Sequence, residues 1–244
     1  MIDTHCHLFK ELYEDLDDLI NTMKNENISA ICNGCESKTN EEVIMLSKKY
    51  ENIYAACGFH PEDIDLGYSK EELINNIDNI VAIGEIGLDY HWNNTNKERQ
   101  QYFFDKQLSM AEELGKPVII HTRDAAQDTY DILKRHHCQG VMHCFSEKRE
   151  MAKLFLKLGY YLSFSGTITF KNAKEPPEVV KITPLERLLV ETDCPYMAPV
   201  PLRGKRNEPS FVVHTTRKVA ELLMMDEEEL LRVINHNYDR LFGE

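Results

Sequence analysis

Eight short apolar runs, separated by stretches with helical spacing, are the feature that most constrains the fold of this chain. The runs are residues 2–7, 28–33, 53–58, 80–86, 118–121, 141–145, 160–164 and 188–193. Near-continuous apolar runs are typical of strands that are buried on both faces of a parallel sheet. Strands that alternate with helices indicate βαβ units, and eight such units can close into a (β/α)8 barrel. We therefore predict an α/β fold of the TIM-barrel type.

The stretches between the runs support this prediction. In two of them residues recur at helical spacing. These are Leu16, Leu19, Ile20 and Met23 in one, and Phe103, Gln107, Met110, Ala111 and Leu114 in the other. The second helix is expected to stop at Gly115, because a glycine followed by Pro117 is a common C-terminal signal. The segment from Ser210 onward predicts two further helices. With 244 residues and no evident linker, residues 1–244 are expected to form a single domain.

His5 and His7 end the first run, with Cys6 between them. Successive side chains of a strand point to opposite faces, so residues two apart share one face. The two imidazoles can therefore reach one metal ion, while Cys6 points the other way. Taken alone, the two histidines are explained equally well as ordinary polar side chains that bind no metal.

Four further ligand-type residues follow at or near predicted strand ends. They are Glu85, His121, His143 and Asp193. The carboxyl ends of barrel strands ring one mouth, where active sites of this fold lie. Each residue alone could be a structural hydrogen-bonding group or a cap, but five such strand ends together favour a metal centre. Four histidines and two carboxylates suit Zn²⁺, Mn²⁺, Fe or Co better than Ca²⁺, and carboxylate with water also suits Mg²⁺.

Two ions at such a site would need a bridging carboxylate, and Glu85 is the best candidate because it lies between the two ligand groups in the sequence. A bound metal lowers the pKa of water, and two metals clamp the attacking and leaving oxygens of an in-line displacement. We expect Asp193 to hold a metal and to take the proton from the attacking water. Glu85 and Asp193 are thus the predicted catalytic residues.

The charge balance limits the partners. With 41 acidic and 28 basic residues, the net charge is -13, which speaks against tight non-specific binding to duplex nucleic acid. No apolar stretch is long enough to span a membrane, so no membrane association is expected. Seven cysteines, an odd count, indicate reduced thiols and a cytoplasmic protein. Cys32 and Cys35 form a lone C-x-x-C, which we interpret as a strand-end turn.

Several motifs resemble those of the TatD-type metal-dependent deoxyribonucleases of the amidohydrolase superfamily. The matching segments are DTHCH at 3–7, GFHP at 58–61, GEIGLDY at 84–90, PVIIHTR at 117–123, HCFS at 143–146, ETDCPY at 191–196 and RGKRNEP at 203–209. The resemblance covers essentially the whole chain. It departs from the family pattern at Glu147, where the family usually has glycine after Phe-Ser.

The resemblance implies a (β/α)8 barrel with two divalent metal ions, Mg, Mn or Zn, and no organic cofactor. It implies that one ion is held by His5, His7, Glu85 and Asp193, and the other by Glu85, His121 and His143. The implied enzyme is a deoxyribonuclease that hydrolyses phosphodiester bonds, with DNA as its substrate. We expect a 3′–5′ exonuclease that acts on single strands as a monomer.

Contacts to the substrate are predicted from position. Arg123 follows His121 by two residues, and Lys205, Arg206 and Asn207 follow the eighth run. Arginine binds phosphate through two nitrogens and lysine supplies a point charge. His60, after the third run, is expected at the same mouth as a donor to phosphate. Solvated surface charge and ordinary ion pairs are the alternatives for these residues.

Two aromatic residues and two other functions remain open at this point. Tyr90 and Trp92 follow the fourth run, and they could stack on a base or pack under their loop. The same metal residues could instead hydrolyse a C–N or ester bond, as in other amidohydrolases, including a deacylase of aminoacyl-tRNA. A metal-containing barrel with a scaffolding role is a third hypothesis, disfavoured by the number of ligand-type residues.

Overall fold

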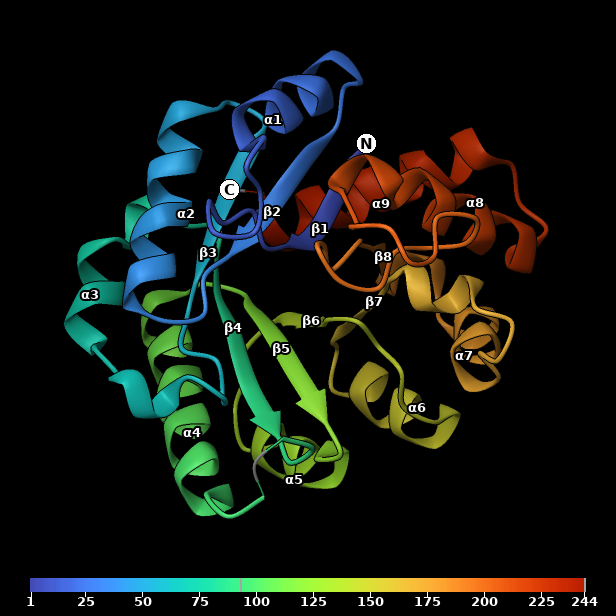
Figure 1. The fold of residues 1–244 in the computed structure, drawn as a ribbon. Helices are drawn as coiled ribbons and strands as arrows, with labels where there is room; N and C mark the ends of the chain where they lie inside the picture. The colour runs from blue at the N-terminus through green and yellow to red at the C-terminus, as the bar shows by residue number, and fades with distance from the viewer. Residues whose placement is uncertain (93, 244) are drawn as a thin grey trace.

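The computed structural model describes residues 1–92 and 94–243, and in this part of the chain eight parallel strands form one sheet in the order β1 to β8 (Figure 1). The strands are β1 Ile2–Cys6, β2 Ser29–Asn33, β3 Ile53–Cys57, β4 Ala82–Asp89, β5 Val118–Arg123, β6 Gly140–Met142, β7 Tyr161–Phe164 and β8 Leu188–Val190. The helices are α1 Leu16–Asn25, α2 Ser37–Lys49, α3 Lys70–Asn75, α4 Lys97–Leu114, α5 Ala126–Leu133, α6 Arg149–Lys157, α7 Glu175–Ile182, α8 Val212–Leu223 and α9 Glu227–Phe242.

The sheet closes between its first and last strands. The backbone N–H of His7 donates to the carbonyl of Cys194 at 2.8 Å, and the N–H of Asp193 donates to the carbonyl of His5 at 2.9 Å. The helices lie outside the ring of strands, with α8 and α9 following β8 (Figure 1). The predicted (β/α)8 barrel with extra C-terminal helices is confirmed. Residues 5–7 and 193–194, far apart in the sequence, lie side by side where the barrel closes.

Burial explains why these runs form strands. Every residue of β1, β4, β6, β7 and β8 is buried, as expected for strands covered by helices on one side and by the barrel interior on the other. The predicted face of α1 packs inward through Leu19, Ile20 and Met23. Helix α4 ends as predicted at Gly115, which adopts the left-handed conformation with φ of 65°.

The strand that carries Glu85 differs from its prediction. The sequence suggested a run that ends at residue 86, but β4 continues to Asp89, so Glu85 lies in the middle of the strand. Its pairing with β5 shifts register between Ile83 and Ile86. Gly87 has φ of 147° and lies so close to β5 that an added Cβ would be 1.9 Å from the carbonyl oxygen of His121. Strands β6 and β8 are shorter than predicted, which leaves His143 and Asp193 just beyond their ends.

Replacement of Gly87 by alanine is expected to lower the free energy of unfolding by more than the roughly 1–3 kcal/mol that a strained φ alone costs. The reason is the added clash with the backbone of β5. Gly67→Ala is the matched control, because Gly67 has φ of 121° with no atom within 4 Å of an added Cβ. Urea denaturation of the metal-free proteins measures both. Equal losses in the two variants would show that the contact with β5 is relaxed.

Two expectations from composition can be compared with the structure. Within residues 1–92 and 94–243, no helix is long and apolar enough to cross a bilayer. All seven cysteines lie in this described part, and none of them is in a disulfide. Cys32 is fully buried, whereas Cys35 is half-buried at the barrel mouth.

Candidate metal centre

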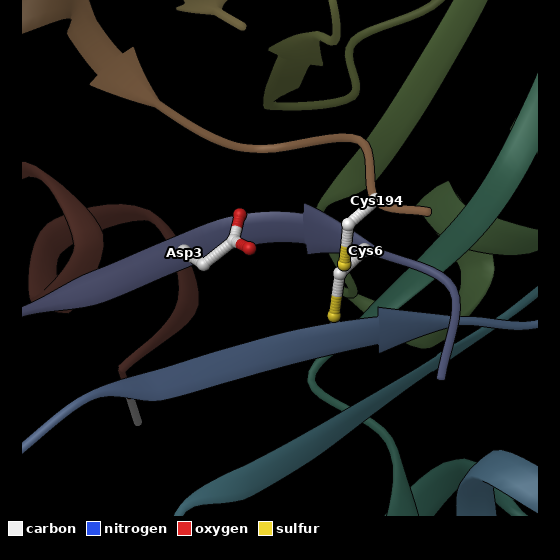
Figure 2. A group of neighbouring side chains, drawn as sticks. All are labelled: Asp3, Cys6 and Cys194. Carbon is white, nitrogen blue, oxygen red and sulfur yellow. The ribbon is translucent and has the colours of Figure 1, made fainter. Parts of the chain in front are cut away.

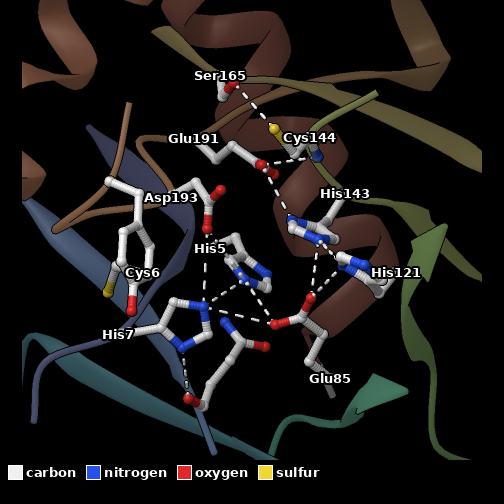
Figure 3. Close-up of polar contacts among 12 residues, drawn as sticks. His5, Cys6, His7, Glu85, His121, His143, Cys144, Ser165, Glu191 and Asp193 are labelled. Atoms are coloured by element: carbon white, nitrogen blue, oxygen red, sulfur yellow. Dashed lines mark hydrogen bonds and ion pairs between the residues drawn. The ribbon is translucent and has the colours of Figure 1, made fainter. Parts of the chain in front are cut away.

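The six predicted metal ligands come together at the mouth of the barrel, although their strands lie far apart in the sequence (Figure 3). Five of the six line a cavity of about 620 Å³, namely His7, Glu85, His121, His143 and Asp193. The sixth, His5, is fully buried and reaches the cluster through Nε2. Cys6 points away from the cluster, as the alternation of the strand predicts (Figure 3).

Glu85 occupies the centre of the cluster. Its Oε1 lies 2.9 Å from Nδ1 of His121 and 2.9 Å from Nε2 of His143. Its Oε2 lies 3.3 Å from Nε2 of His5 and 3.5 Å from Nε2 of His7. The carboxylate therefore turns one oxygen toward each of two imidazole pairs. This is the arrangement that a carboxylate bridging two ions requires.

Asp193 completes the first pair. Its Oδ1 lies 3.8 Å from Nε2 of His5 and 3.6 Å from Nε2 of His7. Burial raises the pKa of Asp193 to about 6, against the opposing effect of the neighbouring His143 and His5. Asp193 can thus offer an oxygen to the same ion as His5 and His7, and it lies at the surface of the cavity, where water has access.

His60 lies closer to the metal ligands than a substrate contact was expected to lie. Its Nε2 is 3.6 Å from Oε1 of Glu85, and its ring meets that of His121 edge-on with centroids 4.6 Å apart. Burial lowers the pKa of His60 to about 3, so the imidazole is neutral at ordinary pH. A neutral imidazole beside Glu85 is better suited to binding a metal than to binding phosphate by charge.

The cluster contains two separate sets of ligand atoms. In each set the three ligand atoms lie within 4.8 Å of one another, and the two sets share no residue. One set is His5, His7 and Asp193, and the other is His60, Glu85 and His121. His143 joins a third set with His5 and Glu85, and Cys35 joins a fourth with His7 and Glu85.

The pKa shifts of Glu85 and His7 fit a metal centre. Those of His143 and His121 go the other way, because burial is outweighed by nearby carboxylates, which raise the pKa of both imidazoles. Burial opposes the charge of Glu85 most strongly, but His143, His5 and His60 outweigh it and hold the pKa of this carboxyl well below its usual value. Burial lowers the pKa of His7 to about 4. Metal ions require ionised carboxylates and neutral imidazoles. A divalent cation would also neutralise the negative charge of Glu85, which is only 3% exposed to solvent.

Outer hydrogen bonds orient three of the imidazoles. Nε2 of His121 lies 3.0 Å from Oδ2 of Asp89, and Nδ1 of His143 lies 3.3 Å from Oε1 of Glu191. Nδ1 of His7 donates to the carbonyl oxygen of Asn33 at 3.1 Å. In each ring the other nitrogen is left to face Glu85 or Asp193. Such outer partners fix the tautomer and raise the basicity of a ligating histidine.

The sequence prediction missed Asp89 and Glu191 as functional residues. A signal was present, because Asp89 follows Glu85 at an even spacing on one strand, and Glu191 precedes Asp193 by two residues. Residues at even spacing on a strand tend to share a face.

Asp89→Ala is expected to weaken metal binding about 10–100-fold, the usual cost of losing an outer partner of a ligating histidine. Asp128→Ala is the control, because Asp128 also accepts from a buried partner, the hydroxyl of Tyr90, but lies outside the cluster. Isothermal titration of metal-free protein with Zn²⁺ measures both. An unchanged affinity in Asp89→Ala would mean that the Asp89–His121 contact does not orient a ligand.

Asp3 is a further buried acidic side chain close to the predicted metal ligands. Together with Cys6 and Cys194 it forms a buried group that resembles a ligand set (Figure 2). However, Asp3 accepts from the backbone N–H of Thr192 at 2.8 Å and from its hydroxyl at 2.5 Å, and the Cys6 thiol donates to the carbonyl of Ile31. The Asp3 bonds tie β1 to the segment after β8, and the Cys6 bond ties β1 to β2, so the group positions Asp193 rather than forming a second centre.

Among the predicted substrate contacts, only Arg123 and His60 lie in the cavity. Lys205 is exposed, and Asn207 is fully buried, where its amide donates to the carbonyls of Thr192 and Tyr196. Asn207 therefore shapes the segment around Asp193 from inside. None of the described residues after Met197 lines the cavity, so the structure does not bring Lys205 and Asn207 to the metal ligands, as the predicted substrate contacts would require.

Arg206 is engaged elsewhere. Its two terminal nitrogens donate to the two carboxylate oxygens of Asp15 at 2.7 and 2.8 Å, and one of them also donates to Glu208. The guanidinium lies 4.6 Å from the centre of the Tyr13 ring. The structure therefore places Arg206 outside the cavity, where it holds its loop against the segment before α1. We therefore expect Arg206→Ala to reduce the stability of this loop. We do not expect it to remove a contact between the protein and a substrate phosphate.

The two aromatic residues after β4 separate. Tyr90 is buried, and its hydroxyl donates to Asp128 at 2.8 Å, so it packs under the loop. Trp92 is 66% exposed and lines the cavity. Glu147, the departure from the family pattern, is half-buried, and burial and the nearby Asp124 raise its pKa.

Comparison with known proteins finds metal-dependent hydrolases among the relatives of this chain. The family described as TatD related DNase matches residues 2–243. The chain is 44% identical to an uncharacterized metal-dependent hydrolase, YabD, of Bacillus subtilis, covering 99% of this chain and 98% of the relative. It is 40% identical to an uncharacterized metal-dependent hydrolase, YcfH, of Escherichia coli K12, covering 99% and 95%. The solved structure of YJJV, a TatD homolog from Escherichia coli K12, superimposes with a TM-score of 0.93 at 31% identity, covering 100% of this chain and 98% of that chain.

Proposed function

The chain belongs to the TatD related DNase family and is a metal-dependent hydrolase, and from this premise we propose that it hydrolyses phosphodiester bonds of DNA. The proposed reaction removes nucleotides from the 3′ end of single strands with two divalent ions. The observation that carries the proposal is the placement of Glu85, whose two oxygens face two different imidazole pairs.

The residues present fit two ions. His5, His7 and Asp193 would hold one, while His121 and His143, with His60 beside them, would hold the other. Glu85 would be shared. When bound, the ions would lower the pKa of water and stabilise charge on the attacking and leaving oxygens of the phosphodiester.

Asp193 is the proposed general base. It combines a position at the cavity surface with a pKa raised by burial to about 6, so its carboxylate can accept a proton from a water that attacks phosphorus. The same proton can then pass to solvent through the open mouth. Asp89 and Glu191 act indirectly, by keeping the outer nitrogens of His121 and His143 protonated and their inner nitrogens available.

Arg123 supports an anionic substrate. It lies at the end of β5, two residues beyond His121, and of the described residues that line the cavity it is the only Arg or Lys. Arginine binds a phosphate through two parallel N–H donors. The remaining lining includes five carboxylates, Glu62, Asp63, Glu85, Asp89 and Asp193, so attraction for a phosphate depends on Arg123 and on the ions.

A substrate panel tests the proposal. Metal-free protein is supplied with Mg²⁺, Mn²⁺ or Zn²⁺ and offered a 5′-labelled single-stranded oligonucleotide, its duplex, a carboxylic ester, an amide and an aminoacyl-tRNA. We expect a ladder of products that shorten from the 3′ end of the single strand. Hydrolysis of the ester, the amide or the aminoacyl-tRNA with the oligonucleotide intact would replace the nuclease with an amidohydrolase-type enzyme.

A further inference from the structure

Trp92 is a large apolar side chain in an unusual position. Its indole is 66% exposed, yet it lines the same cavity as Glu85 and His121. The indole is a large, flat aromatic surface, and nucleic-acid bases stack on such side chains.

The loop of Trp92 is fixed to the metal centre. The backbone N–H groups of His91 and Trp92 both donate to Oδ1 of Asp89, at 2.8 and 3.2 Å. The other oxygen of Asp89 lies 3.0 Å from Nε2 of His121. One carboxylate therefore contacts a predicted metal ligand and also holds the backbone of the loop that carries Trp92.

A cation lies beside the ring. The guanidinium carbon of Arg123 is 5.3 Å from the centre of the Trp92 ring, within the range of a cation–π contact. The edge of His91 meets the indole at 87° with centroids 4.9 Å apart, which steadies the ring without stacking on it. A flat apolar surface and a phosphate-binding cation side by side match the base and the phosphate of one nucleotide.

The opposite side of the mouth is also apolar. Tyr196, which is 55% exposed, lines the cavity after β8, with Phe9 and Met197 near it in the lining. Trp92 follows β4, and β4 and β8 are four strands apart in the order of the eight-stranded barrel formed by the described residues. The cavity lining thus carries apolar side chains from the segment after β4 and from the segment after β8, together with the metal ligands.

We propose that Trp92 is the stacking platform for the unpaired base next to the scissile phosphate, and that Arg123 binds the phosphate of the same nucleotide. This proposal rests on the proposed function and names the part of the substrate that the site recognises. A base that lies on Trp92 cannot be paired in a duplex, so the platform selects frayed or single-stranded ends. Stacking tolerates any base, because every base presents a flat π-face.

The electrostatics of the site make this contact important. With a net charge of -13 and five carboxylates in the cavity lining, the protein offers little long-range attraction to a polyanion. Stacking on an aromatic side chain contributes about 1–3 kcal/mol per base, which corresponds to roughly 5–150-fold in binding. We therefore expect the terminal base to provide a large share of the recognition of the substrate.

Fluorescence tests the contact directly, because Trp92 is the one tryptophan in the sequence. Asp193→Asn protein loaded with Mg²⁺ is titrated with a single-stranded oligonucleotide, and in parallel with one whose last two 3′ nucleotides carry a tetrahydrofuran in place of the base. We expect saturable quenching by the first and little change with the second. Equal quenching by both, or none by either, would overturn the proposal.

Kinetics give a second test with matched variants. Trp92→Leu is expected to lower kcat/KM on the normal oligonucleotide about tenfold, mainly through KM, and to leave the abasic one nearly unchanged. Trp92→Phe should restore most of the loss. Tyr102→Leu is the control, because Tyr102 is 57% exposed on α4 but is not among the described residues that line the cavity. Metal content should be equal in all of them.

Two outcomes separate this proposal from the function on which it rests. An equal loss by Trp92→Leu on both oligonucleotides would mean that Trp92 only shapes the loop, and the platform would be rejected while the nuclease stands. If the wild-type protein hydrolyses neither oligonucleotide, the nuclease is rejected, and the fluorescence titration alone decides whether bases stack on Trp92.

Discussion

Asp193→Asn is expected to lower metal-dependent hydrolysis about 10²–10⁴-fold, the usual contribution of a general base. Asparagine keeps the shape of the side chain but removes the proton acceptor that lies 3.6–3.8 Å from Nε2 of His7 and His5. The fold should tolerate the change, because Asp193 has φ of 56° and asparagine is among the few residues that adopt this left-handed conformation readily.

The control for this prediction removes a similar charge from the same cavity. Asp63 is half-buried and lines the cavity, but it belongs to none of the ligand sets found among the described residues. Asp63→Asn should therefore keep activity within a few-fold of the parent. Steady-state kinetics on the substrate that the panel identifies, with thermal unfolding of both variants, provide the comparison. If Asp193→Asn were as active as Asp63→Asn, Asp193 could not be the base.

Glu85→Gln is expected to cause the largest loss of metal binding of any single change. Each oxygen of Glu85 faces a different imidazole pair, so one substitution disturbs both halves of the centre. Loss of an outer partner of a ligand typically costs 10–100-fold in affinity, and loss of a shared ligand should exceed this range. Equilibrium dialysis against Zn²⁺, followed by metal analysis, measures the affinity and the number of ions bound.

Glu191→Gln is the graded comparison for Glu85→Gln. Glu191 is also a fully buried carboxylate, but it contacts the outer nitrogen of His143, the backbone N–H of Cys144 and the hydroxyl of Ser163, and not two imidazole pairs as Glu85 does. The Glu191→Gln variant should bind metal about 10–100-fold more weakly than the parent and should still bind the same number of ions. Equal effects of the two substitutions would contradict a bridging role for Glu85.

The barrel and the metal ligands could be predicted from the sequence because both depend on local patterns. Apolar runs at regular intervals define the strands. Residues that follow the strands lie together at one mouth of the barrel. The prediction was wrong about where β4 ends. The run was expected to end at residue 86, whereas Gly84 and Gly87 lie inside β4 and allow its close approach to β5. A glycine can mark the end of a strand or a point inside a strand where another backbone approaches closely. Sequence alone does not distinguish these two cases.

The substrate side was harder to predict, because proximity in sequence does not give the direction of a loop. Arg206 and Asn207 lie soon after Asp193 in the chain, but the segment folds back and its polar groups are used internally. The N–H of Asn207 donates to the carbonyl of Pro195 at 3.0 Å, which closes this loop on itself. In contrast, Arg123 remains on its strand, whose direction is fixed by the sheet, and it lines the cavity together with the predicted metal ligands.

The most direct test of the two-ion centre is an anomalous difference map from crystals of the protein grown with Mn²⁺. We predict two peaks about 3.5–4 Å apart, the usual separation in two-metal sites. One should lie beside His5, His7 and Asp193, the other beside His121 and His143, and both within bonding distance of Glu85. A map with no peak at Glu85, or with its peak among Asp3, Cys6 and Cys194 instead, would contradict this account.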